Sequence, residues 1–255
     1  IKQQLLDIFE TLKARRYHNL SGAAAKVQDI INEQPDAAYT HNTLSVIYRR
    51  LNELKKARQS GRMAARRIPD WTEPKANLGK ACFKEGDYDK ALDEFGRIVE
   101  IRPDLAKGYA RRADVFAFLG NFSKAQKEYE KAMQRDSLNP ETHHGLARLQ
   151  MNTGRENEAE QLLRFSLEKH PGYRNNRFLL ARLYHYRFVK YYRRRGKVRE
   201  DLLREATEVL KQEKKCYRAD MIKADIFLTI YSLREELSDL KRNRMVEIFD
   251  VDGFK

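Results

Sequence analysis

A small residue recurs every 34 positions along most of this chain. The series is Ala23, Ala57, Ala91, Ala125 and Ala159. A second series keeps the same interval, with Ser137 at the place of the fourth proline: Pro35, Pro69, Pro103 and Pro171. Self-similarity of this length predicts a stack of equivalent structural units, each of which buries its apolar face against its neighbours.

Two further series keep step with the first. Residue types that tolerate or favour the left-handed conformation of a tight turn stand at His18, Asn52, Gly86, Gly120 and Gly154. Small residues precede the alanine series by twelve positions, at Thr11, Ser45, Gly79, Ala113 and Ala147. These positions predict paired helices that approach closely, joined by a chemically specified turn.

The most complete copy contains Asn77-Leu78-Gly79, Gly86-Asp87-Tyr88, Lys90-Ala91-Leu92, Phe95 and Arg102-Pro103-Asp104. With this pattern the chain resembles the tetratricopeptide repeat, a helix-turn-helix unit. The resemblance implies an all-α fold, a right-handed α-solenoid with a helical C-terminal cap.

The period divides the chain into repeats and a divergent end. Five repeats are expected over residues 4–37, 38–71, 72–105, 106–139 and 140–173. Residues 174–255 are expected to form a divergent sixth repeat, whose long basic first helix runs to about Arg195 and ends at Gly196. Two capping helices, over 200–218 and 220–241, and a short tail are expected to follow.

The charge of the chain favours an acidic partner. Lys and Arg number 51 against 37 Asp and Glu, which gives a net charge of +14. Residues 174–199 contain ten basic residues and no acidic one, so most of the excess is local.

The resemblance implies that the first helix of each repeat lines a concave groove. Cations and one amide are expected on this surface, namely Arg15, Arg49, Arg50, Asn77, Lys80, Lys84, Lys107, Arg111, Arg148 and Arg182. Such a surface suits an acidic peptide or a free C-terminal carboxylate.

Part of this surface is similar to the carboxylate clamp of tetratricopeptide co-chaperones, which hold the acidic C-terminus of heat-shock chaperones. Asn77, Lys107 and Arg111 match three of the five clamp residues. Asn42 replaces the clamp lysine and Val46 replaces its other asparagine. The sequence therefore predicts a non-enzymatic adaptor for a protein partner with an acidic segment.

The basic aromatic stretch 182–199 leaves three interpretations open. Leu180, Tyr184, Phe188 and Tyr191 share one helical face, which predicts a core stripe with arginines on the opposite face. Alternatively, an acidic protein or a nucleic acid contacts the cations Arg187, Lys190, Arg193, Arg194 and Arg195.

Motifs for catalysis or for a cofactor are not recognisable in the sequence, and the histidines lack ligand spacing for a metal. The tail around Asp250 looks like the opening motif of haloacid-dehalogenase-type phosphatases, but Phe254 replaces the usual Thr. We therefore expect no enzyme activity, cofactor or metal.

The location of the chain is predicted from absences. No apolar run is long enough for a membrane span, and Cys82 and Cys216 have no redox or metal spacing, so a cytoplasmic protein is expected. Because the chain begins at Ile1, a regulatory repeat module of a larger signalling protein is a further alternative.

Overall fold

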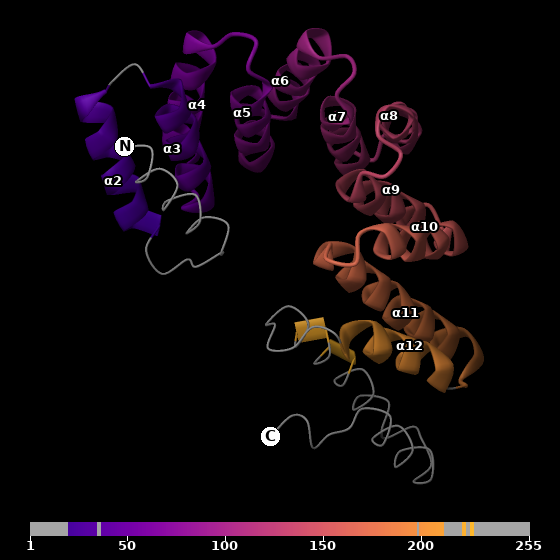
Figure 1. The fold of residues 1–255 in the computed structure, drawn as a ribbon. Coiled ribbons are helices and arrows are strands. Elements are labelled where there is room, and N and C mark those ends of the chain that lie inside the picture. The colour runs from indigo at the N-terminus through magenta and orange to yellow at the C-terminus, as the bar shows by residue number, and fades with distance from the viewer. Residues whose placement is uncertain (1–19, 35–36, 198, 212–220, 223–224, 227–255) are drawn as a thin grey trace. The chain divides into compact units, whose positions relative to one another are not determined.

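The computed structural model describes residues 20–34, 37–197, 199–211, 221–222 and 225–226. The chain divides into two compact units, Ile1–Ser137 (unit 1) and Leu138–Lys255 (unit 2). All regular structure in the described residues is helical (Figure 1). Unit 1 contains α2 (Leu20–Glu33), α3 (Ala38–Arg50), α4 (Leu54–Arg67), α5 (Thr72–Glu85), α6 (Tyr88–Ile101), α7 (Ala106–Phe118) and α8 (Phe122–Arg135). Unit 2 contains α9 (Pro140–Asn152), α10 (Glu156–Lys169), α11 (Arg174–Arg195) and α12 (Glu200–Lys211).

The helices are arranged as antiparallel pairs. Within unit 1, α3 packs on α4, α5 on α6 and α7 on α8, and α3 also contacts α5 (Figure 1). Within unit 2, α9 packs on α10 and α11 on α12, and α11 also contacts α9. The first helices α3, α5, α7, α9 and α11 each begin 34 residues after the preceding one. The all-α repeat fold predicted from the period is confirmed.

The turns between paired helices use the predicted left-handed positions. Asn52, Gly86, Gly120 and Gly154 have φ angles of 66°, 87°, 75° and 78°. At the end of α5, the amide of Asp87 donates to the carbonyl of Cys82 at 3.0 Å, which satisfies an otherwise unpaired carbonyl of the last turn. The expected turn at His18 lies outside the described residues.

The small residues mark the places where paired helices touch. A Cβ atom added to Gly79 of α5 would lie 2.5 Å from Cε1 of Phe95 on α6, closer than packed atoms allow. Phe95 is only 2% exposed, and burying a side chain of this size contributes about 2 kcal/mol. In the preceding pair, the Ser45 hydroxyl donates to the Ala57 carbonyl at 2.7 Å. Small side chains are thus needed for the pairs to close.

The core of unit 2 is built on α11. Leu180, Tyr184 and Phe188 are buried, and they belong to one apolar cluster with residues of α10 and α12 such as Leu163 and Leu203. The predicted core stripe is confirmed for these three residues, while Tyr191 is half-buried.

The C-terminal end of α11 also follows the prediction. Gly196 adopts a left-handed conformation (φ 60°), and its amide donates to the carbonyl of Tyr192 at 2.8 Å. The following helix, α12, is described to Lys211. The expected continuation of this helix from 212 to 218 lies outside the described residues. So does the expected tail. Of the second capping helix, expected over 220–241, the structure describes only residues 221, 222, 225 and 226.

Candidate functional site

An amide pair joins α3 and α5 in unit 1. The side-chain nitrogen of Asn77 donates to the side-chain oxygen of Asn42 at 2.9 Å, and both residues are buried. A buried amide needs such a partner, because an unmade hydrogen bond there is costly. Asn77, which was predicted to face a ligand, therefore helps to hold two first helices in register.

Basic side chains gather near the C-terminal ends of α3 and α5. Arg49 is half-buried, and its Nε has no hydrogen-bond partner. Burial lowers the pKa of the Arg49 guanidinium, and the nearby charges of Arg50 and Arg111 lower it further. Lys84 lies beside this residue, since its Nζ donates to the Arg49 carbonyl at 3.4 Å. Neither Arg49 nor Lys84 forms an ion pair within the described part of unit 1.

On α7 the cation Arg111 has an acidic neighbour. Its guanidinium pairs with the Asp114 carboxylate at 3.0 Å, and the Tyr129 hydroxyl donates to the other oxygen of the same carboxylate at 2.7 Å. Asp114 is therefore held by two partners on the protein. Lys107, four residues before Arg111, is half-buried on the same helix.

Exposed aromatic rings also lie on first helices of unit 1. Phe118 of α7 lies 5.1 Å from the Phe83 ring of α5 and 5.2 Å from the Tyr88 ring of α6, and it is 60% exposed. Tyr39 of α3 lies 4.7 Å from the ring of Trp71 and is 63% exposed. Both Phe83 and Phe118 lie on first helices, as the basic residues do.

In unit 2 the basic residues of α11 face acidic residues of α10. Arg187 pairs with Glu160 and lies 3.6 Å from Glu156, and it also donates to Asn157 at 2.9 Å. Lys190 pairs with Glu156. The Arg187 side chain is 15% exposed, so the ion pairs are mostly covered. These two cations are engaged within the chain.

Glu160 is the centre of this network. The hydroxyl of Tyr184 donates to it at 2.7 Å and Arg164 donates at 3.0 Å, in addition to Arg187. Burial acts to raise the pKa of the Glu160 carboxyl, but these three hydrogen bonds outweigh burial and lower it. Burial and the bond to Glu160 raise the pKa of Tyr184 above its usual value.

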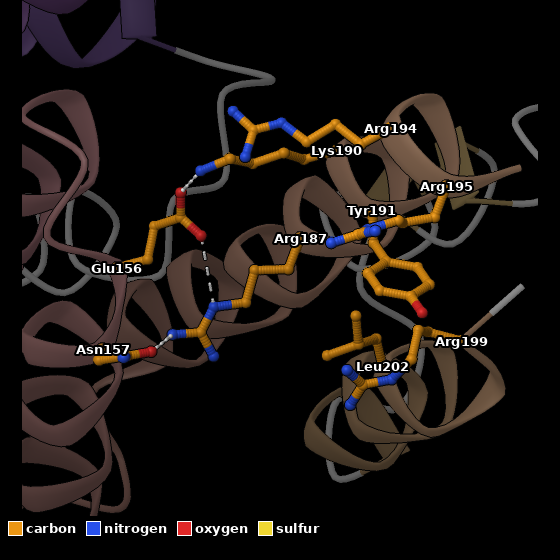
Figure 2. A pocket seen from close by; sticks show the side chains of 9 residues that line it. All are labelled: Glu156, Asn157, Arg187, Lys190, Tyr191, Arg194, Arg195, Arg199 and Leu202. Atoms are coloured by element: carbon orange, nitrogen blue, oxygen red, sulfur yellow. Dashed lines mark hydrogen bonds and ion pairs between the residues drawn. The ribbon is translucent and has the colours of Figure 1, made fainter. Parts of the chain in front are cut away.

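A cavity of about 450 Å³ lies at the C-terminal end of α11 (Figure 2). It is lined by Glu156, Asn157, Arg187, Lys190, Tyr191, Arg194, Arg195, Arg199 and Leu202. The guanidinium of Arg199 lies 5.5 Å from the centre of the Tyr191 ring and pairs with Asp201. The described residues contain no ion pair of Arg194 or Arg195, and Figure 2 draws none.

Family comparison supports what the helix pairs indicate. Tetratricopeptide-repeat family models match residues 73–105 and 119–164. The tetratricopeptide-repeat protein TTC0263 from Thermus thermophilus has a TM-score of 0.64 at 21% identity, covering 71% of this chain and 97% of that one. The chain carries tetratricopeptide repeats. The APC/C hetero-tetramer Cut9-Hcn1 shows the same fold, with a TM-score of 0.64 and 14% identity over 95% of this chain and 48% of that one.

Curated relatives of these tetratricopeptide repeats are larger proteins. A heat shock protein sti1 homolog from Schizosaccharomyces pombe is 34% identical over 67 residues, which are 26% of this chain and 11% of that protein. Hsp70-Hsp90 organizing protein 3 from Arabidopsis thaliana is 35% identical over 85 residues, 33% of this chain and 15% of that protein. A UDP-N-acetylglucosamine-peptide N-acetylglucosaminyltransferase from Giardia intestinalis is 28% identical over 109 residues, which are 43% of this chain and 7% of that protein. The chain spans 7% to 15% of the length of these three relatives.

The remaining predicted contact residues of the tetratricopeptide array are distributed over both units. Arg15 lies outside the described residues. Arg148 on α9 and Arg182 on α11 are exposed in unit 2, and Lys80 on α5 is half-buried in unit 1. Arg193, Arg194 and Arg195 are exposed. The predicted groove residues are therefore considered separately in each unit.

Sequence reasoning did not single out the acidic residues of the α10 and α11 network. Glu156 and Glu160 are spaced four apart on a second helix, a pattern visible in the sequence. In the described residues no cluster of three or more His, Cys, Asp or Glu side chains is placed to hold a metal ion. In the same residues no helix is long and apolar enough to cross a membrane. The tetratricopeptide fold supports a role in protein interaction.

Proposed function

We propose that the chain is a non-enzymatic adaptor in which α3, α5 and α7 of unit 1 bind an acidic segment of a protein partner. One observation carries the proposal: Arg49 is held half-buried beside Arg50 and Arg111, with a lowered pKa and an Nε that has no hydrogen-bond partner. The side chain keeps its charge despite this shift, because an arginine cannot be deprotonated in a protein.

An anion is the ligand that such a cluster favours. Like charges held together in a partly dry environment repel one another, and a carboxylate placed among them removes that repulsion. It also supplies charge-assisted hydrogen bonds, which are stronger than neutral ones. Aspartate and glutamate side chains of an extended peptide meet this requirement at several points, from Lys84 to Lys107.

The similarity to Hsp70-Hsp90 organizing protein 3 supports a partner that is a protein. The sequence matches the carboxylate clamp of the co-chaperones at Asn77, Lys107 and Arg111, but the amide of Asn77 is already bonded to Asn42. We therefore propose that side-chain carboxylates contribute most of the binding and that a free terminal carboxylate contributes little.

The test is a titration of the full chain with a fluorescent peptide of about twelve residues rich in Asp and Glu, followed by fluorescence anisotropy. The double variant K107E/R111E is expected to weaken binding at least about tenfold, roughly 1.4 kcal/mol, with unchanged helical content. The charge-matched control K124E/K127E changes the exposed face of α8 and is expected to weaken it less than about threefold.

Equal losses in the two double variants would mean that net charge, and not this surface, determines binding.

Amidation of the peptide C-terminus distinguishes side-chain carboxylates from the terminal carboxylate as the groups that bind. We expect it to leave the affinity unchanged, whereas a loss comparable to that of K107E/R111E would identify a terminal carboxylate as the group that binds.

Nucleic-acid binding through the stretch 182–199 is less well supported. Base stacking requires accessible rings, and Tyr184 and Phe188 are 2% and 0% exposed. Arg187 and Lys190 are paired with glutamates of α10. These two rings and two cations are thus used by the fold of unit 2, whereas Tyr186, Arg193, Arg194 and Arg195 are exposed.

A further inference from the structure

The cavity at the end of α11 has the size of a small-molecule site. Its volume of about 450 Å³ falls within the roughly 300–1,000 Å³ of typical ligand pockets. Its lining residues all belong to unit 2 and include none of the residues proposed to bind a peptide in unit 1. Residues from three helices or their ends contribute to its wall: α10, α11 and α12.

The charge of this cavity is strongly positive. Its lining contains one carboxylate, Glu156, and the five cations Arg187, Lys190, Arg194, Arg195 and Arg199. Glu160 and Asp201 lie nearby, where they pair with Arg187 and Arg199. Even with both acids included, cations outnumber carboxylates, and the excess corresponds to Arg194 and Arg195.

The end of a helix accounts for only part of this excess. The C-terminus of a helix carries a partial negative charge, so arginines in the last turn of α11 are favourable without any ligand. That effect applies equally to Arg193, which does not line the cavity. It explains neither why the cavity remains open nor why Arg199, beyond the helix end, turns toward it with its guanidinium against Tyr191.

The cations of the wall are suited to a compact anion with several charges. A guanidinium presents parallel N–H donors that match two phosphate oxygens at once, and Arg194, Arg195 and Arg199 approach from different points of the wall (Figure 2). A ligand with one charge would neutralise only one of the two cations in excess, Arg194 and Arg195. An extended polyanion would make most of its contacts outside a cavity of this size.

We propose that this cavity binds a small ligand carrying two or more phosphate groups. Arg194 and Arg195 hold its phosphates, and Arg199, positioned by Tyr191 and Asp201, closes one side. Arg187 and Lys190 also line the cavity, where they pair with carboxylates of α10, and they contribute mainly to the shape of the site.

The test is isothermal titration calorimetry of the full chain with inositol hexakisphosphate and with pyrophosphate, at about 150 mM salt to screen surface charges. We expect saturable binding of one ligand per chain. The variant R194A/R195A is expected to weaken it at least about tenfold. The variant R193A/K197A removes the same charge from neighbouring exposed positions that do not line the cavity, and is expected to weaken it less than about threefold.

Three further measurements distinguish a built phosphate site from general charge attraction. The variant R194K/R195K keeps the charge at the helix end and loses the bidentate geometry, so it is expected to fold normally and still bind several-fold more weakly. Phosphate monoesters gain their second charge near pH 6, so affinity for inositol hexakisphosphate is expected to rise between about pH 5.5 and 7.5. Citrate, an anion with carboxylates in place of phosphates, is expected to bind at least about tenfold more weakly.

A second experiment, with lipid vesicles, distinguishes a lipid headgroup from a soluble phosphate compound as the ligand. Sedimentation with phosphatidylcholine vesicles that contain a multiply phosphorylated inositol lipid tests a headgroup, and competition by the soluble probe tests whether both use this cavity. Binding in either arm that is lost in R194A/R195A and kept in R193A/K197A supports the proposal. Absence of saturable binding in both arms, or equal losses in the two double variants, overturns it.

Discussion

Arg49 in unit 1 and Arg187 in unit 2 both lie on the first helix of a repeat and are both partly covered, yet their surroundings have opposite charge. Arg49 is flanked by Arg50 and Arg111, which lower its pKa together with burial. Arg187 is surrounded by Glu156, Glu160 and Asn157. Among the described residues Arg49 has no ion pair and its neighbour Arg111 pairs with Asp114, whereas Arg187 has two carboxylates of α10 beside it. A basic residue of a first helix can therefore lie among like charges, as Arg49 does, or against carboxylates of the preceding helix, as Arg187 does on α10.

The largest effect is expected from reversing Arg187. Arg187→Glu places a third carboxylate against Glu156 and Glu160 in a mostly covered site, and is expected to cost roughly 3–5 kcal/mol. Hydrogen exchange of the amides in α10 and α11 measures this loss locally, which suits a repeat array better than one global melting curve. Arg182→Glu, an exposed position on the same helix, is the control and should change protection by less than about 0.5 kcal/mol. Similar losses in both would show that the pairs of Arg187 have no special weight.

A smaller effect, with a defined pH dependence, is expected at Glu160. Its folded pKa is lowered below the unfolded value of about 4.3, so its ionised form stabilises unit 2 above that pH. This contribution is lost as the pH falls through the lower, folded pKa. Glu160→Gln should cost roughly 1–3 kcal/mol at neutral pH and should flatten the fall in protection of α10 and α11 between about pH 5 and 3.

The exposed Glu168 provides the control for this pH series. Glu168→Gln removes a carboxylate that is 69% exposed and that, among the described residues, pairs only with its neighbour Lys169. It should leave the acid dependence of α10 and α11 almost unchanged. If Glu160→Gln and the native chain lost protection in parallel on acidification, the network around Glu160 would not be the origin of the pH dependence.

The smallest effect on stability is expected from replacing Arg49, and this replacement is expected to leave stability unchanged or to raise it. Arg49→Met removes a charge that its neighbours repel and keeps most of the side-chain volume, so protection of α3 should change by less than about 0.5 kcal/mol or rise slightly at low salt. Arg58→Met, in the same unit, breaks the pair of Arg58 with Glu85 and should lower protection. A clear loss at Arg49 would mean that this cation is structural, and the contrast with Arg187 would disappear.

The sequence predicts the fold of this chain well because close packing constrains residue size. Gly79 opposes Phe95 at a distance that admits no Cβ, and Ala91 and Ala125 are fully buried. Few residue types satisfy such positions, so their period of 34 is visible without a structure. The end of α11 at Gly196 was predictable for a similar reason, since a left-handed helix end favours glycine.

The roles of the charged residues were less predictable. Arg187 and Lys190 carry the same charge as Arg194 and Arg195, and the sequence left open for all four whether they contact an external partner or only cover the outer face of a helix. The partners that separate them, Glu156 and Glu160, lie 27 to 34 positions away, and contact depends on how α10 packs on α11. Asn77 was similarly predicted to meet a ligand, but its bond to Asn42 depends on the approach of α3 to α5.

The ring contact between Tyr39 and Trp71 has a practical consequence. Trp71 is the only tryptophan among the 255 residues, and it lies in unit 1 next to an exposed side chain of α3. Its emission spectrum therefore reports on one region of the chain without any chemical label. An acidic peptide without tryptophan does not contribute to tryptophan emission, so quenching or a spectral shift during a titration would arise from the protein alone. Binding events confined to unit 2 would leave this emission unchanged.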